Sequence, residues 1–289
     1  MFVLNIRIKF QKYGVMRFVG HLDIMRYFQK SLRRANISVT YSEGYNPHQI
    51  MSFAAPLGVG VTSDGEYLDI EVTNTNSSEA SIEALNDVMV DGVSILEYKK
   101  LPDTAKTSMA LVAAADYLLI EKPGYNVPFE QTQWEEKLNE FYQQEEILIT
   151  KQTKKSETVM DLKPLIYKMT AVDLEDKELL RTLKVSSPDM NLWSGTGMFL
   201  QVCTGSITNI KPELVLEAFY DFCGLSLNPL AFQVHRLEVY ANSDVIAVKG
   251  EKERQAYQLV LEQKKAEFAQ KQQQFPRFSP LGDFGEIIY

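Results

Sequence analysis

Apolar and polar side chains alternate over residues 2–10. Leu4, Ile6, Ile8 and Phe10 fall on one side of the alternation, and mostly polar side chains fall on the other. A period of two residues is typical of a half-buried β-strand, because successive side chains of a strand point to opposite faces of its sheet. We therefore predict a strand with one apolar face.

The period changes to that of an amphipathic helix between about residues 21 and 35. The apolar residues predicted to form its buried stripe are Leu22, Ile24, Met25, Phe28 and Leu32. Asp23 lies in the first turn, where the helix dipole favours a carboxylate. Four cations are spaced as neighbours on the opposite surface, namely Arg26, Lys30, Arg33 and Arg34. The helix is predicted to bury one face and to expose a basic one.

The next segments complete an α+β pattern. Residues 37–41 resemble a short strand, residues 42–47 carry Gly and Asn-Pro turn signals, and Ser63-Asp64-Gly65 is typical of a tight turn. Strands are predicted at 66–72 and 93–99, with a helix between them that Ser77 or Ser78 caps. The order β-α-β-β-α-β over residues 1–102 predicts a ferredoxin-like domain, the split β-α-β arrangement.

A second α+β domain is predicted for residues 108–241. Its expected strands are 117–121, 147–151, 165–172, 179–186, 198–203 and 232–240, and its expected helices are 129–145 and 212–222. Another ferredoxin-like unit is one interpretation of this less regular pattern. Residues 250–289 are predicted to form a polar C-terminal helix followed by a solvated tail, and a tail that docks on a partner is the alternative.

Charge is distributed unevenly along the 289 residues. The net charge is −8, but residues 1–50 hold eight Lys and Arg against Asp23 and Glu43, so this segment carries +6 and the remainder carries −14. A sequence pI of about 5.1 argues against nucleic-acid binding over the whole surface. A local basic patch on an acidic body is compatible with these values, as is a chance grouping of cations on one helix.

Several classes of site have no support in the sequence. No apolar run is long enough to cross a bilayer, and the first residues lack the pattern of a signal peptide, so we expect a cytoplasmic protein without a membrane partner. Cys203 and Cys223 are too few to hold a cubane iron–sulfur cluster, and we expect no cofactor and no metal in this chain. Phosphate-loop, dinucleotide, zinc-protease and nucleophile-elbow motifs are also missing.

Two histidines lie in the same N-terminal region as the basic helix. His21 and Asp23 are at the predicted helix start, and His48 follows Asn46-Pro47. Two imidazoles and a carboxylate can bind a metal ion or transfer protons, which makes His21, Asp23 and His48 candidate catalytic residues. Their spacing is not diagnostic, and local capping is the alternative. His235, on a predicted strand beside Arg236, is expected to be structural.

This region also offers the groups that bind RNA. Aromatic rings stack on unpaired bases, and cations hold phosphates. The candidate nucleic-acid-binding residues are Arg17, Arg26, Lys30, Arg33, Arg34, Tyr45, Asn46 and His48. Tyr41 and Phe53 flank the loop, and we expect Phe53 to be a core residue. Asn46 is also compatible with a role in the turn that Asn-Pro favours.

Three segments resemble the radical-SAM-linked protein family, a domain of unknown function. They are RFVGHLDIMRYFQKSLRRA at 17–35, YSEGYNPHQIMSFAAPLGVGVTSDGEYLDIEV at 41–72 and, more loosely, KKSETVMDLKPLI at 154–166. The resemblance implies a radical SAM enzyme as partner, fused or encoded nearby, which would carry the iron–sulfur cluster, S-adenosylmethionine and cobalamin. It also implies a link to ribosome-related components and supplies no activity. The chain lacks the CxxxCxxC cluster motif, so it resembles the stand-alone companion.

The sequence favours an accessory, non-catalytic protein that binds RNA, or an RNA-bound substrate, for a radical SAM partner. An enzyme with a metal or acid–base site at His21, Asp23 and His48 is the second hypothesis. A protein–protein scaffold is the third. The first hypothesis depends on the basic helix face and the loop at 42–48 meeting in one recognition site.

Overall fold

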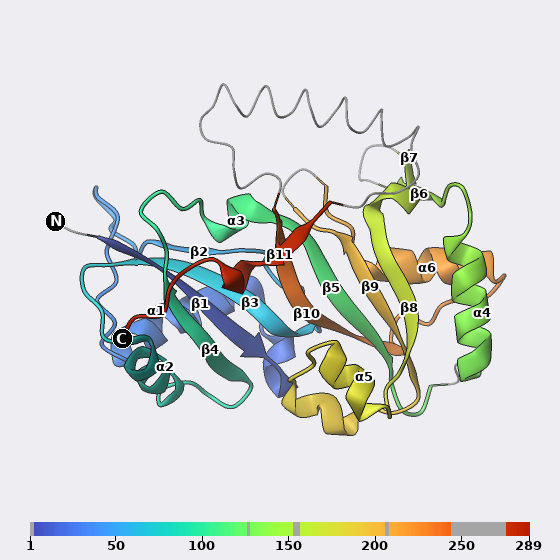
Figure 1. The fold of residues 1–289 in the computed structure, drawn as a ribbon, viewed down its shortest axis with the longest axis horizontal. Helices are drawn as coiled ribbons and strands as arrows, with labels where there is room; N and C mark the ends of the chain where they lie inside the picture. Colours follow the sequence, from blue (N-terminus) through green and yellow to red (C-terminus); the bar gives the residue numbers. More distant parts are fainter. Residues whose placement is uncertain (1–2, 126–127, 153–156, 206–207, 244–275) are drawn as a thin grey trace.

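One β-sheet extends through both halves of the chain. The computed structural model describes residues 3–125, 128–152, 157–205, 208–243 and 276–289, and it orders the main strands β4-β1-β3-β10-β5-β9-β8 (Figure 1). The N-terminal half supplies β1 (Leu4–Lys12), β3 (Thr62–Val72) and β4 (Val93–Lys100). The C-terminal half supplies β5 (Val112–Glu121), β8 (Ile166–Asp173), β9 (Thr196–Cys203) and β10 (Phe232–Asn242). The halves are therefore joined edge to edge.

The junction between the halves is the pairing of β3 with β10. These two strands are parallel, and the register pairs His235 with Thr62 and Arg236 with Ser63. Away from this contact, β2 (Met51–Phe53) pairs with the far end of β3, and β11 (Phe278–Pro280) pairs with the end of β10. The direct backbone contact is thus short, which leaves side chains on both faces of the sheet to stabilise it.

Four helices cover one face of the sheet. α1 (His21–Arg34) and α2 (Ser78–Asn86) pack on the N-terminal half, and α4 (Gln131–Tyr142) and α6 (Pro212–Phe222) pack on the C-terminal half. Figure 1 shows α1 and α6 behind the sheet. Trp134 of α4 stacks on Phe219 of α6 at 5.3 Å between ring centroids, and both are fully buried. We call this the helical face.

The opposite face is covered by shorter elements. They are α5 (Lys177–Thr182), the 3-10 helix η3 (Pro188–Leu192), β11 and the 3-10 helix η4 (Leu281–Asp283). The remaining short elements are η1 (Gly14–Phe18), α3 (Ser108–Leu111), η2 (Lys163–Leu165) and the hairpin of β6 (Leu148–Gln152) and β7 (Glu157–Asp161). In the described chain, no helix is long and apolar enough to cross a membrane.

The N-terminal elements form largely as the side-chain pattern predicts. Ile24, Phe28 and Leu32 of α1 are buried, and the Phe28 ring lies 4.7 Å from that of Phe10. Phe53, at 9% exposure, is a core residue as predicted. Leu22 was predicted to be buried and is 61% exposed, so that expectation is wrong. Leu22 precedes Arg26 by four positions, which places it on the exposed basic face rather than on the apolar stripe.

The predicted α+β class is confirmed. Within each half, the fourth, first, third and second main strands along the chain lie side by side in that order. This order is β4-β1-β3-β2 in the N-terminal half and β10-β5-β9-β8 in the C-terminal half. Because the two halves share one sheet, this order does not by itself establish a ferredoxin-like fold for either one. The ferredoxin-like assignment and the division at 1–102 and 108–241 therefore stay predictions. The helix expected at 251–274 lies outside the described residues.

Two local predictions are wrong. Residues 179–186, predicted as a strand, form most of α5 and the segment after it, because Asp176 caps a short helix by accepting from the amides of Glu178 and Leu179. Ser63-Asp64-Gly65, predicted as a turn, lies inside β3. A Cβ at Gly65 would lie 2.7 Å from the carbonyl oxygen of Leu237, so this glycine permits close strand approach and not a turn.

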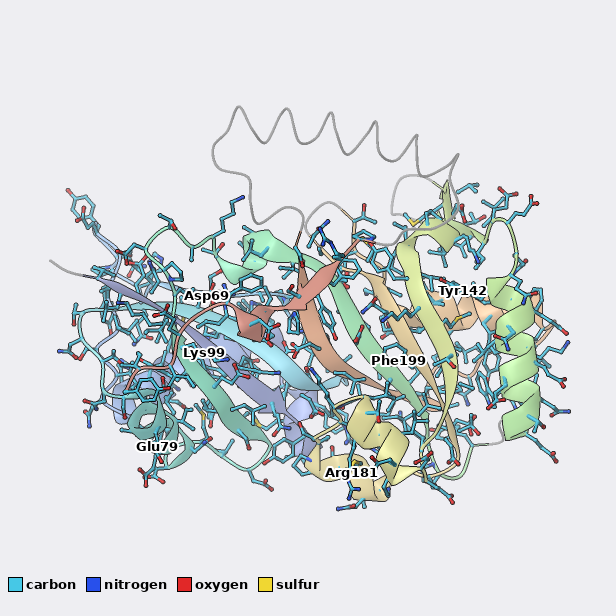
Figure 2. The ribbon with its side chains drawn as sticks, viewed as in Figure 1. Asp69, Glu79, Lys99, Tyr142, Arg181 and Phe199 are labelled. Carbon is cyan, nitrogen blue, oxygen red and sulfur yellow. The ribbon has the colours of Figure 1, made fainter. Side chains whose placement is uncertain are left out.

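The C-terminal tail, residues 276–289, packs on its own chain and is not the solvated end that was predicted. Leu281 is fully buried, and its carbonyl oxygen accepts from Arg7 at 3.1 Å. Lys99 donates to the carbonyl oxygen of Gly282 at 2.9 Å, and Glu286 pairs with Lys100. Figure 2 shows Lys99 and Asp69 on the side of the sheet that the tail crosses. The tail therefore connects the two halves.

Candidate functional site

The basic face of α1 is exposed as predicted. Arg26, Lys30, Arg33 and Arg34 all lie in solvent. Arg26 forms an ion pair with Asp23 at 3.2 Å, and Arg34 donates to the carbonyl oxygen of Val88 at 3.0 Å. Within the described residues, Lys30 and Arg33 form no ion pair or side-chain hydrogen bond. These two cations are therefore free to contact an external anion.

The loop at 42–48 is closed on itself and carries an exposed aromatic ring. The amide of Ser42 donates to the carbonyl oxygen of His48 at 2.8 Å, and the Ser42 hydroxyl lies 2.8 Å from Nδ1 of His48. Gly44 has a φ of 111°, which glycine adopts without strain. Tyr45 is 110% exposed, so its side chain makes no packing contact that shields it. His48 closes the loop, and Tyr45 projects from it.

The loop and the end of α1 are close in the chain. Residues 35–41 alone separate them, and the amide of Ile37 donates back to the carbonyl oxygen of Leu32 at 3.0 Å. The chain then pairs with the end of β3 through Val39 and Val72. Asn46 is exposed at the loop tip beside Tyr45. The final turn of α1 and the loop therefore belong to the same end of the N-terminal half.

The three candidate catalytic residues do not converge. The His21 ring packs edge-on against Phe53 at 5.2 Å, whereas Asp23 is exposed and paired with Arg26. His48 precedes Phe53 by five residues of extended chain, which corresponds to roughly 16 Å. The described residues contain no group of three or more His, Cys, Asp or Glu side chains placed to hold a metal ion. The geometry gives no support to a joint site at His21, Asp23 and His48.

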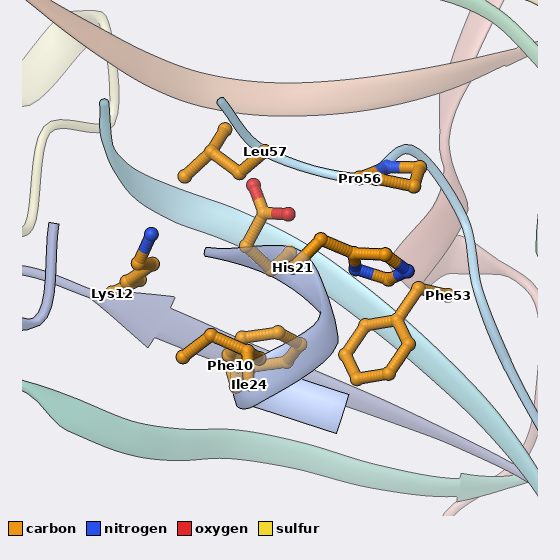
Figure 3. A pocket seen from close by; sticks show the side chains of 8 residues that line it. Phe10, Lys12, His21, Ile24, Phe53, Pro56 and Leu57 are labelled. Carbon is orange, nitrogen blue, oxygen red and sulfur yellow. The ribbon is translucent and has the colours of Figure 1, made fainter. Parts of the chain in front are cut away.

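His21 instead lines a small pocket on the helical face. Figure 3 shows it beside Phe53 and Pro56, with Lys12 entering from β1. The pocket is completed by Phe10, Ile24, Leu57 and Glu66. Its volume of about 10 Å³ accommodates at most one water molecule. A substrate does not fit this space.

The charged groups of this pocket are mutually satisfied. Lys12 donates to the carbonyl oxygen of Val19 at 2.9 Å, and burial lowers the pKa of Lys12 while Glu66 opposes that change. Glu66 accepts from Nε of Arg236 at 2.8 Å, across the β3–β10 junction. Burial alone would lower the pKa of Arg236, but Glu66 holds it above its usual value. This cluster stabilises the junction, and nothing in it is free to react.

A second polar network lies on the other face of the same junction. Thr62 Oγ1 is 2.9 Å from Nδ1 of His235, and Nε2 of His235 is 3.2 Å from Oδ2 of Asp64. Asp64 also accepts from the amides of Ser186 and Ser187. Burial would raise the pKa of Asp64, but the neighbouring His235 imidazole and these amides hold it below its usual value.

A hydroxyl, an imidazole and a carboxylate in sequence are also the parts of a nucleophilic relay. Here Thr62 is 1% exposed and His235 is fully buried, with the Trp193 ring 5.0 Å from the imidazole. A substrate cannot reach the Thr62 hydroxyl in this arrangement. His235 is structural, as the sequence suggested, and Asp64 is its partner.

The residues that join the halves were not predicted from the sequence. Lys12, Glu66 and Arg236 are ionisable side chains within strands, and Asp64 was assigned to a turn. Charged side chains in a strand normally mark its exposed face, so the pattern alone gives no reason to bury them. The available signal was the pair His235-Arg236 between apolar residues in the middle of a strand, because a buried cation requires a partner elsewhere.

Comparison with known proteins identifies a family and no activity. Residues 5–212 match the model of a family described as "Uncharacterized protein conserved in bacteria (DUF2344)". No curated protein matches the chain. A solved structure, described as an unknown protein from Galdieria sulphuraria, aligns over 81% of this chain and 98% of its own, with 10% identity and a TM-score of 0.21. A similarity at that level carries no argument about fold or function.

Proposed function

The chain belongs to this family of uncharacterized bacterial proteins, and we propose that it is a non-catalytic accessory protein that binds single-stranded RNA, or an RNA-bound substrate, for a radical SAM enzyme. The RNA site consists of the basic face of α1 and the loop at 42–48. The partner is proposed from the resemblance of residues 17–35 and 41–72 to the radical-SAM-linked family. The partner would hold the iron–sulfur cluster, S-adenosylmethionine and cobalamin.

The observation that carries the RNA proposal is the combination of free cations with a free aromatic ring. Lys30 and Arg33 have no protein partner among the described residues, and Tyr45 is fully exposed. Cations without partners bind phosphates without first breaking an ion pair. An exposed tyrosine stacks on an unpaired base and costs nothing in lost core packing. Both requirements of single-strand binding are thus present at one end of the N-terminal half.

The acidic character of the rest of the chain restricts RNA to this face. The 239 residues after position 50 carry a net charge of −14 in a chain whose total is −8. An RNA backbone is repelled by most of that surface and attracted to the N-terminal cations. Arg17, whose guanidinium lies 4.8 Å above the Phe18 ring, extends the basic surface beyond the first turn of α1. Phe18 is 62% exposed and adds a second ring for stacking.

The test compares three variants for binding to a fluorescent single-stranded RNA over a range of salt concentrations. Lys30→Gln with Arg33→Gln removes two free cations, and we expect the slope of log K against log salt to fall by about 1.4, or about 0.7 per phosphate contact. Tyr45→Ala removes the stacking ring, which is expected to weaken binding by about 1–3 kcal/mol with little change in slope.

The matched control is Lys177→Gln with Arg181→Gln. Both residues are exposed on α5, in the other half of the chain, so the change in net charge is the same. The control variant should bind RNA as the wild type does. Absence of RNA binding by the wild type, or an equal loss in the control, would contradict the proposal.

A protein-docking scaffold is the second candidate function. Four apolar side chains near the start of α1 are strongly exposed, namely Val15 (74%), Phe18 (62%), Leu22 (61%) and Val59 (65%). The amide of Gly60 donates to the carbonyl oxygen of Arg17, which holds the segment at 58–60 against η1. Exposed apolar side chains in a group favour a protein interface. Phe18→Ser with Leu22→Ser should then prevent co-purification of the radical SAM enzyme.

A further inference from the structure

Two cations from different halves of the chain are neighbours beside the β3–β10 junction. Arg17 is in η1, and Lys122 directly follows β5. The amide of Gly60 donates to the carbonyl oxygen of Arg17 at 2.7 Å, and Nε2 of Gln233 donates to the carbonyl oxygen of Gly60 at 2.8 Å. The amide of Lys122 donates to the carbonyl oxygen of Ala231 at 2.8 Å. These contacts hold the backbones of both cations in place.

The two side chains have no counter-charge in the part of the chain that the structure describes. Both are half-buried, and neither forms an ion pair or donates a hydrogen bond to a protein group. The guanidinium of Arg17 lies against the Phe18 ring, 4.8 Å from its centroid. Burial lowers the pKa of Lys122, and the positive charge of Arg17 lowers it further. A bound anion would relieve this repulsion between like charges.

The carboxylates of the adjoining elements are engaged elsewhere. Glu121, next to Lys122 in the sequence, accepts from Nε1 of Trp134 at 2.8 Å, and burial raises the pKa of this carboxyl to about 7. Asp189 of η3 accepts from the amide of Gly14, at the start of η1, at 3.0 Å. Neither carboxylate forms an ion pair with the two cations. The cations are therefore available to a ligand.

We propose that Arg17 and Lys122 bind a phosphomonoester, which in the proposed function is the terminal phosphate of the single-stranded RNA. The inference rests on that function and extends the RNA site into the C-terminal half. A phosphomonoester carries a charge of about −1.5 to −2 at pH 7, whereas each phosphate within the chain carries one negative charge. Two adjacent cations therefore favour the end of the strand. The Arg17 guanidinium can donate to two phosphate oxygens, and the Lys122 ammonium adds a second charge.

The Phe18 ring offers a second contact to the terminal nucleotide. It is 62% exposed and directly follows Arg17 in the chain. A terminal base can stack on this ring while its phosphate contacts the cations, because the Arg17 and Phe18 side chains touch. α1, with 14 residues, spans about 21 Å between this ring and the loop at 42–48. The RNA then extends along α1, with its end at the junction.

The first experiment compares one internally labelled single-stranded RNA in three forms, namely with a 5′-phosphate, with a 3′-phosphate and with hydroxyls at both ends. We expect the wild type to prefer a phosphorylated form over the hydroxyl form by about fivefold at constant salt. Arg17→Gln and Lys122→Gln should each reduce this ratio to below about twofold, because one charge of the pair is lost. Lys122→Arg should retain the ratio.

The matched control is Lys211→Gln. Lys211 is exposed and follows β9 at the end of the sheet opposite to Lys122, since the register pairs Cys203 with Ala114 at the start of β5. The control should keep the wild-type ratio. RNA that binds without a preference for a terminal phosphate, or a preference unchanged in Lys122→Gln, overturns the proposal.

The second experiment does not depend on RNA. The full chain is labelled with carbon-13 at Cε of lysine, and the NMR signal of Lys122 is identified by its loss in Lys122→Gln. Inorganic phosphate, added in place of chloride at constant ionic strength, should shift this signal saturably and leave that of Lys211 unchanged. Arg17→Gln should weaken the effect about fivefold.

The two experiments separate failure of this site from failure of the RNA function. A Lys122 signal that phosphate does not shift saturably overturns the phosphate site, whether or not RNA binds. A saturable shift in a protein that binds none of the three RNA forms supports the phosphate site and contradicts the RNA function.

Discussion

Asn36, Lys184 and Gly224 each follow the end of a helix with a positive φ, of 56°, 60° and 69°. In each case the next residue donates its amide to a carbonyl oxygen five positions earlier, which is the Schellman type of helix end. Glycine adopts this conformation freely, and asparagine tolerates it. Lysine gains nothing from it, so Lys184 is held there by its surroundings.

Replacing Lys184 with glycine should therefore stabilise the protein. We expect Lys184→Gly to raise the free energy of unfolding by about 0.5–1 kcal/mol, because the strained φ is relieved and part of the gain is lost to the greater freedom of glycine in the unfolded chain. Gly224→Ala is the matched opposite change. A Cβ there has no atom within 4 Å, so its expected cost of about 1 kcal/mol is conformational. Urea denaturation measures both, and a less stable Lys184→Gly protein would contradict this explanation.

Glu121 should make stability depend on pH near neutrality. Burial raises the pKa of its carboxyl to about 7, and a hydrogen bond from Nε1 of Trp134 at 2.8 Å opposes that rise. The folded state therefore holds the proton more tightly than the unfolded state. Its contribution to stability is complete below the unfolded pKa of about 4.3 and is lost as pH rises to about 7.

Glu121→Gln removes this dependence, because glutamine stays neutral and its carbonyl oxygen can still accept from Trp134. The variant and the wild type should be equally stable near pH 4. Near pH 8 the variant should be more stable by roughly 1 kcal/mol, after allowance for the partial exposure of the side chain. Urea unfolding at several pH values measures the difference. A difference that does not change with pH would contradict the assignment to Glu121.

At the scale of elements, the sequence predicted those that pack an apolar face locally. β1, α1 and α6 follow their side-chain periods, and Ser77 caps α2 by accepting from the amide of Ala80, as expected. The predictions failed where distant parts of the chain supply the partners. Residues 63–65 have the composition of a turn, but Asp64 is buried against His235 of β10. The tail has the composition of a solvated end, but Arg7 and Lys99 donate to its carbonyl oxygens.

In the candidate site, too, the features set by local sequence were predictable and those set by tertiary contacts were not. The exposure of the four α1 cations was predictable, since helical spacing alone places them on one face. Three other features were not predictable, because each depends on tertiary neighbours. They are the isolation of Lys30 and Arg33, the exposure of Tyr45, and the lack of contact among His21, Asp23 and His48. The proximity of Arg17 and Lys122 was also unpredictable, since the two residues belong to different halves of the chain and meet only at the junction.

The tail should contribute to stability as a packed element. Leu281 is fully buried and belongs to the main apolar core, so Leu281→Ala should lower the free energy of unfolding by about 2–5 kcal/mol. Tyr289, 102% exposed, is the control, and Tyr289→Ala should have no measurable effect. Chemical denaturation compares the two. A neutral Leu281→Ala variant would show that the tail does not pack in solution.

Considered as a whole molecule, the chain is held together by charges on both faces of one short junction. Glu66 and Arg236 pair on the helical face, at 2.8 Å between Oε1 and Nε. On the other face, Lys9 binds Glu238 at 2.7 Å, and His235 lies 3.2 Å from Asp64. Separating the halves would break all three of these contacts, and an unpaired buried charge is far more costly than a lost surface contact.

The two halves should therefore unfold together, although the sequence suggests two domains. We expect one calorimetric transition, with coincident curves from circular dichroism of the whole chain and from fluorescence of Trp134 and Trp193, which both lie in the C-terminal half. Glu66→Gln should lower stability by about 3–5 kcal/mol and keep the transition single, because Arg236 belongs to one half and Glu66 to the other. Glu178→Gln, at an exposed ion pair with Arg181, should change it by less than about 0.5 kcal/mol. Two separate transitions in the wild type, or a Glu66→Gln effect confined to the fluorescence signal, would mean that the halves are stable alone and that the junction only aligns them.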